Sequence, residues 1–208
     1  MSLHHVRALV LGAALAPLAA ITLAAQQPQQ GPPLPPNGWR IDPGHSAITF
    51  RVRHLGMTWV NGKFGSWTGA LVFDSANPEA ATVEAHIHAA SVNTENERRD
   101  NDVRQNYFVV DSFPEITFVS RRVERAGEGC LRVTGDLTIH GVTKSVVLET
   151  EIAGQMNGQR GKRMAFTATT TISRREFGIL RNGMMEGVAV VGDEIRITID
   201  IEAVQPNG

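Results

Sequence analysis

Apolar and polar residues alternate with a period of two through most of the chain from Trp39 onward. In residues 46–54 (SAITFRVRH), Ile48, Phe50 and Val52 occupy every second position, and polar or charged residues stand between them. Because successive side chains of a strand point to opposite faces, these three residues share one face. The segment is therefore predicted to be a strand with one buried face.

The same alternation returns along the chain and predicts eight strands in all. Short turn signals such as Ala76-Asn77-Pro78 and His140-Gly141 separate the strands. Short connections join antiparallel neighbours, whereas parallel strands need a crossover of about a dozen residues, so a doubly wound α/β fold is excluded. The later strand segments are 62–74, 81–92, 114–122, 130–140, 142–152, 163–173 and 194–204.

One stretch departs from the two-residue period. Thr94 and Glu97 have the spacing of a capping box, and the polar sequence behind them extends to Tyr107. We expect a helix near residues 95–107 and a second, short helical turn near residues 175–177.

Eight antiparallel strands with one apolar face form either a sandwich or a barrel. Closure into a barrel removes the exposed sheet edges. We therefore expect an all-β fold, an eight-stranded antiparallel up-and-down barrel with the one helix near 95–107. A barrel of this size is either filled by its own side chains or holds one slender ligand, and the pattern leaves both open.

Composition and charge narrow the choice of partners. The 208 residues are 42% hydrophobic and 20% charged, as in a soluble globular domain with accessory segments. Lys and Arg number 20 against 21 Asp and Glu, so the net charge of -1 offers no basic field to nucleic acid. Cys130 is the one cysteine, which excludes an internal disulfide framework and a multi-cysteine zinc site.

The first residues have the layout of a secretory signal peptide. Arg7 precedes an apolar run, residues 8–25, that ends in small residues. An uncleaved membrane anchor is the alternative, but Gly12 and Pro17 weaken a lipid-packed helix. We expect a cleaved signal peptide at 1–25 and a periplasmic or secreted mature protein.

The rest of the chain divides into three parts. A Pro/Gln-rich linker at 26–38 is predicted to be an extended spacer, with a ligand for an aromatic-lined groove as the alternative. The barrel domain is expected at 39–204, followed by a tail at 205–208.

Short motifs follow one another in a distinctive order over the barrel domain. They are Ile41–Ser46 (IDPGHS), Arg99-Asp100, Phe113–Phe118 (FPEITF) with Ser120, Gly135–Lys144 (GDLTIHGVTK), and Arg174 with Phe177-Gly178. In this order the sequence resembles the YceI-like family, exported lipocalin-like barrels associated with polyisoprenoid binding. The resemblance implies an apolar tunnel that holds an isoprenoid or a similar lipid tail.

One segment departs from the family pattern. After Arg99-Asp100 the family usually has His-Leu and then Asp-Phe-Phe-Asp, whereas this chain has Asn101-Asp102-Val103 and later residues 106–111 (NYFVVD). The helix beside the tunnel mouth is therefore expected to differ, which affects headgroup contacts more than the fold.

The expected ligand site combines an apolar tunnel with basic residues at its mouth. Arg98 and Arg99 are headgroup candidates because a planar guanidinium holds a pair of phosphate oxygens, with a solvated helix face as the alternative. Lys144 and Arg174 are further headgroup candidates. The expected tunnel residues are Phe50, Val52, Phe64, Trp67, Ile87, Phe108, Phe118, Leu137, Leu148, Phe166, Ile172 and Phe177.

Histidines support the rival function, a metal-dependent enzyme or sensor. His86 and His88 project from one strand face together with Glu84, although polar residues on a solvent-facing side give the same pattern. His45 and Ser46 are adjacent, so on a strand they point opposite ways, which argues against a hydrolase. They are expected, with Asp42, to tie down a turn.

The favoured interpretation is non-catalytic sequestration or transport of an apolar chain, a polyisoprenoid or a fatty-acyl-like lipid. We expect no catalytic residue, no metal and no cofactor, with the lipid as the bound ligand. The expected partners are this lipid and, transiently, a membrane; nucleic acid is not expected. The residues leave the oligomeric state, the chain length and the headgroup open.

Overall fold

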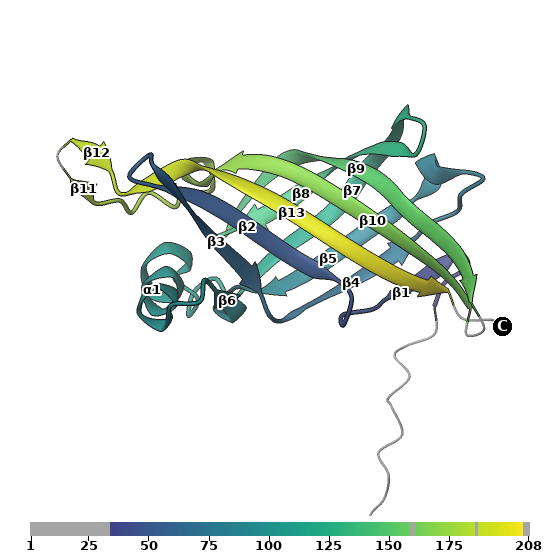
Figure 1. Cartoon of the computed structure of the whole chain (residues 1–208), viewed down its shortest axis with the longest axis horizontal. Helices are drawn as coiled ribbons and strands as arrows, with labels where there is room; N and C mark the ends of the chain where they lie inside the picture. Colours follow the sequence, from purple (N-terminus) through teal and green to yellow (C-terminus); the bar gives the residue numbers. More distant parts are fainter. Residues whose placement is uncertain (1–33, 159–160, 186, 206–208) are drawn as a thin grey trace, which may run out of the picture. The chain divides into compact units, whose positions relative to one another are not determined.

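The computed structural model describes residues 34–158, 161–185 and 187–205, which form mainly antiparallel strands (Figure 1). The strands are β1 Gly38–Ile41, β2 Ala47–His54, β3 Thr58–Phe64, β4 Trp67–Val72, β5 Thr82–His88, β6 Val92–Asn93, β7 Glu115–Gly127, β8 Cys130–Ile139, β9 Val142–Gly158, β10 Gly161–Ser173, β11 Met184–Met185, β12 Val188–Ala189 and β13 Val191–Gln205. The helical segments are η1 Pro78–Ala80, η2 Ala89–Ser91, α1 Glu97–Asp102, η3 Val103–Phe108 and η4 Arg174–Phe177.

The sheet closes on itself through β13 and β1. Strand β13 pairs with β10 along most of its length, with β2 over residues 191–200, and with β1 near its end. Strand β1 also pairs with β4 and completes a closed ring of eight strands: β1, β4, β5, β7, β8, β9, β10 and β13. The predicted all-β, eight-stranded antiparallel barrel is confirmed, and β2, β3 and β6 extend its wall at one end.

Each barrel strand turns its apolar residues inward. In β8, Leu131, Val133 and Leu137 are buried, whereas Arg132 between them is exposed. The paired strand β9 follows the same register, with Leu148 opposite Val133. Directly opposite residues share a face, so the alternation seen in the sequence becomes a continuous apolar inner wall.

Two glycines leave room for aromatic rings on this inner wall. A Cβ atom at Gly62 would lie 2.3 Å from the Phe50 ring, and one at Gly135 would lie 2.4 Å from the Phe118 ring. Both separations are far shorter than a van der Waals contact. The two rings therefore pack directly against glycine backbone, where a residue with a Cβ atom would clash with them.

One end of the barrel is closed by packed side chains. Trp39 of β1 is buried and donates its indole N–H to the Phe73 carbonyl oxygen at 2.9 Å. Phe73 meets Phe166 edge to face, with ring centroids 5.2 Å apart. Met164 and Ala203 are buried beside them. We call this the closed end, and the opposite end, which carries α1, β11 and β12, the mouth (Figure 1).

The predicted strand 62–74 is wrong as a single element. Strand β3 ends at Phe64 and β4 begins at Trp67. Between them the backbone pairs elsewhere, because the Gly65 N–H donates to the Ser91 carbonyl at 3.1 Å and the Ser66 carbonyl accepts from the His88 N–H at 3.0 Å. The alternation of apolar and polar residues continues through this corner, so the sequence pattern does not show that the strand is interrupted there.

The predicted helix is present as α1 followed by a π-helical turn, η3, and it spans 97–108 where 95–107 was expected. Asn96 caps it by accepting the Arg99 N–H at 3.0 Å. Thr94, the expected cap, is buried and instead donates its N–H and its hydroxyl to Asp100 Oδ1 at 2.8 and 2.5 Å. The predicted second helical turn is confirmed as η4.

Strand β1 begins at Gly38 and β13 ends at Gln205, so ordered strands reach one residue beyond the expected domain 39–204 at either end. The signal peptide at 1–25, residues 26–33 of the linker and residues 206–208 of the tail lie outside the described residues. Within the described part, every helix is too short or too polar to cross a membrane.

Candidate ligand-binding site

The barrel encloses a cavity of about 790 Å³. Its wall is formed by the inward-facing residues of the strands, and it extends from Ile41, Leu71 and Phe73 near the closed end to the helical segments at the mouth. Ile195, Ile197, Ile199 and Ile201 line it from β13 and are only half-buried because their side chains face this space. Between the two interpretations left open by the pattern, the structure favours an enclosed space over a filled core.

Every residue expected in the tunnel lies on the cavity wall; contact with a ligand stays a prediction for each. Phe50, Phe64 and Phe108 form an aromatic line from the wall to η3, with ring centroids 5.6 and 6.0 Å apart. The residues so placed are Phe50, Val52, Phe64, Trp67, Ile87, Phe108, Phe118, Leu137, Leu148, Phe166, Ile172 and Phe177.

Polar groups reach the cavity mainly at the mouth. Arg98, Arg99, Asp102 and Arg181 line it there. The Arg98 guanidinium makes no hydrogen bond or ion pair with any described residue. Arg99, in contrast, donates from Nε to Thr94 Oγ1 and from Nη2 to the Thr94 carbonyl, both at 2.7 Å. Of the two predicted headgroup arginines, Arg98 is therefore the one available to a ligand.

Tyr107, next to Phe108 in the chain, also lines the cavity. Burial, and secondarily the charge of Asp102, raises the pKa of its hydroxyl, which therefore stays protonated near neutral pH. Within the described part of the chain, this hydroxyl has no hydrogen-bond partner. It can donate a hydrogen bond to a polar atom inside the cavity.

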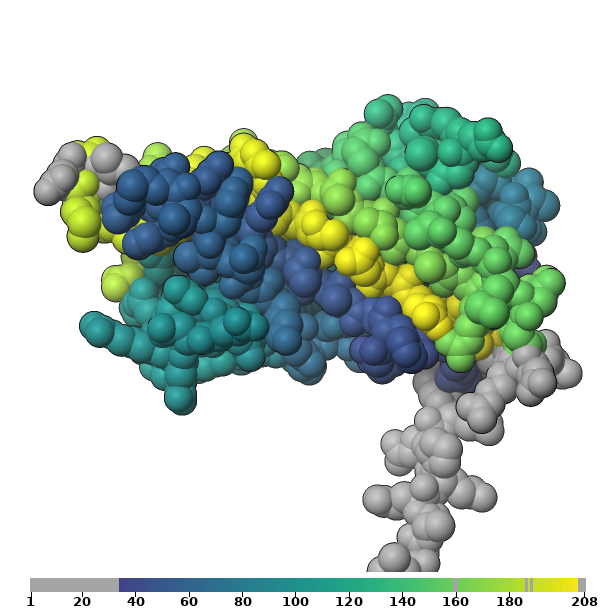
Figure 2. Space-filling view, viewed as in Figure 1, coloured from purple at the N-terminus to yellow at the C-terminus, as the bar shows by residue number. Residues whose placement is uncertain are grey.

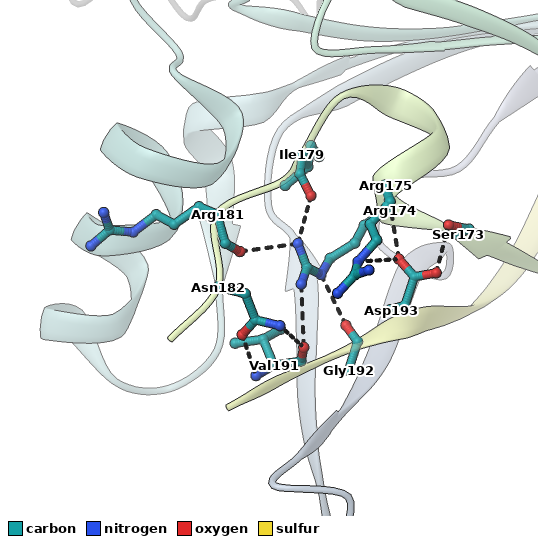
Figure 3. Close-up of polar contacts among 9 residues, drawn as sticks. All are labelled: Ser173, Arg174, Arg175, Ile179, Arg181, Asn182, Val191, Gly192 and Asp193. Carbon is teal, nitrogen blue, oxygen red and sulfur yellow. Dashed lines mark hydrogen bonds and ion pairs between the residues drawn. The ribbon is translucent and has the colours of Figure 1, made fainter. Parts of the chain in front are cut away.

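Arg174, another predicted headgroup residue, is buried with a 3% exposed fraction. Its Nε donates to the Gly192 carbonyl at 2.9 Å, Nη1 to the carbonyls of Ile179 and Arg181 at 2.5 and 3.0 Å, and Nη2 to the Val191 carbonyl at 3.3 Å (Figure 3). Burial lowers the pKa of the guanidinium from its usual value. Although it borders the cavity, Arg174 is committed to backbone carbonyls.

Lys144 does not line the cavity. It borders a separate depression with Thr171, Glu176 and Asp193, between the start of β9 and the end of β10. The structure thus separates Lys144 from Arg98 and Arg99, with which the sequence grouped it. The alternation of residues along the strand gives Lys144 an inward-facing position. Because Lys144 lies near a hairpin, this position is open to solvent, which sequence alone could not show.

His86 lies on the exposed outer wall. Its Nε2 is 2.9 Å from Glu84 Oε1 and its Nδ1 is 3.5 Å from Glu115 Oε2. The hydrogen bond with Glu84, with a smaller contribution from Glu115, raises the pKa of the imidazole and favours the charged form, which binds no metal. His88 is exposed, and its imidazole has no polar partner among the described residues.

Asp42, His45 and Glu202 bring three metal-type ligand atoms within 4.8 Å of one another in the described chain. Arg163 forms ion pairs with both carboxylates, so its guanidinium supplies the positive charge that a metal ion would otherwise supply at this cluster. His45 Nδ1 lies 3.1 Å from Asp42 Oδ2, and Ser46 Oγ bonds the Glu202 backbone. The predicted turn-stabilising role of Asp42, His45 and Ser46 is confirmed.

Comparison with known proteins decides the family. The family model of the YceI-like domain matches residues 39–203, nearly the whole described chain. The chain belongs to the YceI-like family. A relative in Salmonella arizonae, named Protein YceI, is 36% identical over 163 residues, which cover 77% of this chain and 82% of that protein.

Solved structures of similar proteins support the YceI-like fold. The YceI protein of Campylobacter jejuni has a TM-score of 0.65 and 30% identity, covering 74% of this chain and 90% of that one. A polyisoprenoid binding domain from Saccharophagus degradans, implicated in plant cell wall breakdown, has a TM-score of 0.60 and 15% identity, covering 82% and 99%. At that identity the second likeness shows the fold alone.

Proposed function

We propose that this YceI-like protein binds an apolar chain, a polyisoprenoid or a fatty-acyl-like lipid, in its barrel cavity and sequesters or carries it without catalysis. The observation that carries the proposal is the enclosed apolar cavity of about 790 Å³. This volume falls in the range of about 300–1,000 Å³ of pockets that hold small ligands. The Saccharophagus degradans domain of the same fold is a polyisoprenoid binding domain, which agrees with this class of ligand.

The wall chemistry supports a hydrocarbon occupant. Aliphatic and aromatic side chains of the strands supply the wall, and polar groups are concentrated at the mouth. Water in such a space would lose hydrogen-bond partners, whereas each buried methylene contributes about 0.8 kcal/mol to binding. No cofactor is needed for this activity, since the lipid itself is the occupant.

The polar groups at the mouth suit recognition better than proton transfer. Tyr107 keeps its proton near neutral pH, and Arg174 is bound to carbonyls. Arg98 is exposed beside the opening and free to pair with an anionic headgroup. We therefore assign Arg98 as the principal headgroup residue, with Arg99 positioning the segment that carries it.

We further propose that the protein acts outside the cytoplasm after removal of residues 1–25. This rests on Arg7 and the apolar run 8–25 with its small-residue end. Intact-mass analysis of the exported protein should find a chain that begins near Gln26. Recovery of the full 208-residue chain from membranes would contradict cleavage.

Native mass spectrometry combined with lipid extraction tests the binding function. The exported protein is expected to carry one lipid per barrel. Ala168 is buried and lines the cavity, whereas Thr169, the next residue of β10, is exposed. Ala168→Trp should fill the space and lower lipid occupancy several-fold, and the matched control Thr169→Trp should retain it, because successive strand residues face opposite sides.

Two results would contradict lipid binding. One is a folded Ala168→Trp variant, judged by circular dichroism, that keeps the original lipid stoichiometry. The other is a wild-type protein that carries stoichiometric zinc or iron and no lipid, which would favour the metal-dependent alternative at His86 and His88.

A further inference from the structure

Large apolar side chains are exposed around the mouth. Met57, in the β2–β3 turn, is 68% exposed, and Leu180, just after η4, is 69% exposed. In β11, the exposed fractions of Met184 and Met185 are 67% and 55%. Scattered single apolar residues on a surface need no explanation, but several at one end of a molecule indicate an interaction site.

These residues belong to two adjoining segments. We call residues 179–185 and 187–190 the mouth arm, the stretch between η4 and β13 that contains β11 and β12. The Val190 carbonyl of the arm accepts the Leu55 N–H of the β2–β3 turn at 3.0 Å. On its other side, Arg181 of the arm pairs with Asp102 of α1 at 3.3 Å. The arm and the turn therefore project together beside the opening (Figures 1 and 2).

The arm is held in place by the hydrogen bonds drawn in Figure 3. Arg174 binds the carbonyls of Ile179 and Arg181, on either side of Leu180. Asn182 makes a pair of hydrogen bonds with the Val191 backbone, at 3.0 and 3.1 Å. Ile179 is 7% exposed and Leu180 69%. The fixed backbone thus turns one apolar residue into the barrel and the next into solvent.

Basic residues surround an aromatic ring on the neighbouring outer wall. The guanidinium carbons of Arg51, Arg53 and Arg196 lie 4.8, 4.1 and 4.9 Å from the Trp59 ring centre. One of the three, Arg196, is also paired with Glu194. The three arginines come from β2 and β13, within a few residues of the β2–β3 turn. Positive charge and an amphipathic ring therefore border the exposed apolar residues.

We propose that the mouth end docks on an anionic lipid bilayer. Leu180, Met184 and Met185 insert among the headgroups, and the arginines around Trp59 contact anionic phosphates. Exposed apolar side chains beside Lys or Arg and Trp are the combination that binds at a charged membrane surface. A carrier of the proposed lipid must exchange it with a membrane, so the inference extends the proposed function, but docking itself needs no occupied cavity.

Vesicle flotation with the exported protein, its N-terminus first fixed by intact mass, tests the docking surface. The vesicles contain phosphatidylcholine alone or with about a third phosphatidylglycerol, and no isoprenoid, so cavity loading does not enter. Wild type should float with the anionic vesicles, less at high salt. Met184→Ser/Met185→Ser should reduce binding roughly tenfold through lost apolar insertion.

Matched variants separate this surface from general stickiness. Met156→Ser removes a methionine that is 59% exposed at the far end of the barrel, so it should float like wild type. Arg51→Gln/Arg196→Gln should weaken binding to anionic vesicles by roughly fivefold per charge and leave binding to neutral vesicles unchanged. The control Lys162→Gln, beside the β9–β10 hairpin, should have no effect.

Several outcomes would overturn the docking surface. The first is that the wild-type protein does not float with vesicles at low salt, and the second is that Met156→Ser loses as much vesicle binding as Met184→Ser/Met185→Ser. The third is a dimer in size-exclusion chromatography that Met184→Ser/Met185→Ser dissociates, which would assign the surface to a second copy. Lipid occupancy by native mass spectrometry keeps the two proposals apart. A protein that carries lipid but does not float refutes docking alone, and one that floats but never carries lipid refutes the binding function alone.

Discussion

The two ends of the barrel are completed by different kinds of interaction. At the closed end, Trp39, Phe73 and Phe166 interlock, and a single indole hydrogen bond orients the tryptophan. At the mouth, Arg174 binds a backbone carbonyl of the mouth arm, and Asn182 of the arm binds the backbone of β13. Packing leaves no space, whereas hydrogen bonds hold irregular backbone without filling the interior behind it. The closed end is therefore built for stability and the mouth for access.

The largest expected difference between the ends concerns stability. Phe166→Ala should lower the free energy of unfolding by about 3–5 kcal/mol, because it removes a buried ring from the edge-to-face contact with Phe73. Phe64→Ala, nearer the mouth, removes a half-buried ring and should cost less than about 2 kcal/mol. Urea denaturation followed by circular dichroism measures both. Equal losses would show that the two ends contribute alike.

The next effect concerns the polar support of the mouth. Arg174→Met keeps a long side chain but leaves backbone carbonyls of the arm and β13 without a donor, at an expected cost of roughly 2–4 kcal/mol. Hydrogen exchange should rise first in residues 179–182 and 190–192. Its exposed neighbour provides the control, and Arg175→Met should change stability by less than about 0.5 kcal/mol. Unchanged exchange in Arg174→Met would contradict the supporting role.

A smaller effect separates headgroup from tail recognition. Arg98→Ala should weaken binding of a phosphorylated isoprenoid by about 1.5–3 kcal/mol and leave a neutral prenyl alcohol nearly unaffected. Arg99→Ala should weaken both ligands, since Arg99 holds Thr94 at the start of the helical segment. Arg163→Ala, at the closed end, should affect neither. Isothermal titration calorimetry with both ligands measures these affinities. If Arg98→Ala lost equal affinity for the charged and the neutral ligand, Arg98 would be a solvated residue without a headgroup role.

The smallest effect is the response of the closed end to acid. The hydrogen bond from His45, followed by the Gly44 N–H, holds the pKa of Asp42 below its ordinary value of 3.8, against the opposing effect of burial. A folded pKa below the unfolded one stabilises the fold above that ordinary value, and this stabilisation is lost as pH falls through the folded pKa. NMR titration of Asp42 measures this, and Asp42→Asn should remove the acid-dependent step. An Asp42 pKa at or above 3.8 would contradict it.

The sequence predicted the barrel wall well because burial there follows a local rule. The period of two places Phe50, Phe118 and Leu148 inward wherever a strand is regular, and all three line the cavity. The corner at Gly65-Ser66 is invisible to that rule because its cause is pairing with Ser91 and His88, which no local pattern reports. Strand β1 is short and pairs at both sides with distant strands, so it escapes the rule for the same reason.

The mouth was predicted less well because its contacts join segments far apart in the sequence. Arg174 has the residue type of a headgroup ligand, yet its partners lie in the arm and at the start of β13. Which of Arg98 and Arg99 is available to a headgroup depended on whether Thr94 caps the helix or hydrogen-bonds to Asp100. Both questions require the tertiary structure, since arginine and threonine have several local uses of similar energy.

Strand β13 also determines when the chain can fold. It pairs with β1, β2 and β10, so the ring lacks its final neighbour until residues 191–205 are available. Until then β2 and β10 present unpaired edges, which are templates for association. Pairings such as Arg40 with Val204 have high contact order, for which folding takes roughly milliseconds to seconds. The barrel is therefore expected to form in one late cooperative step, and a chain without β13 has an open, aggregation-prone sheet.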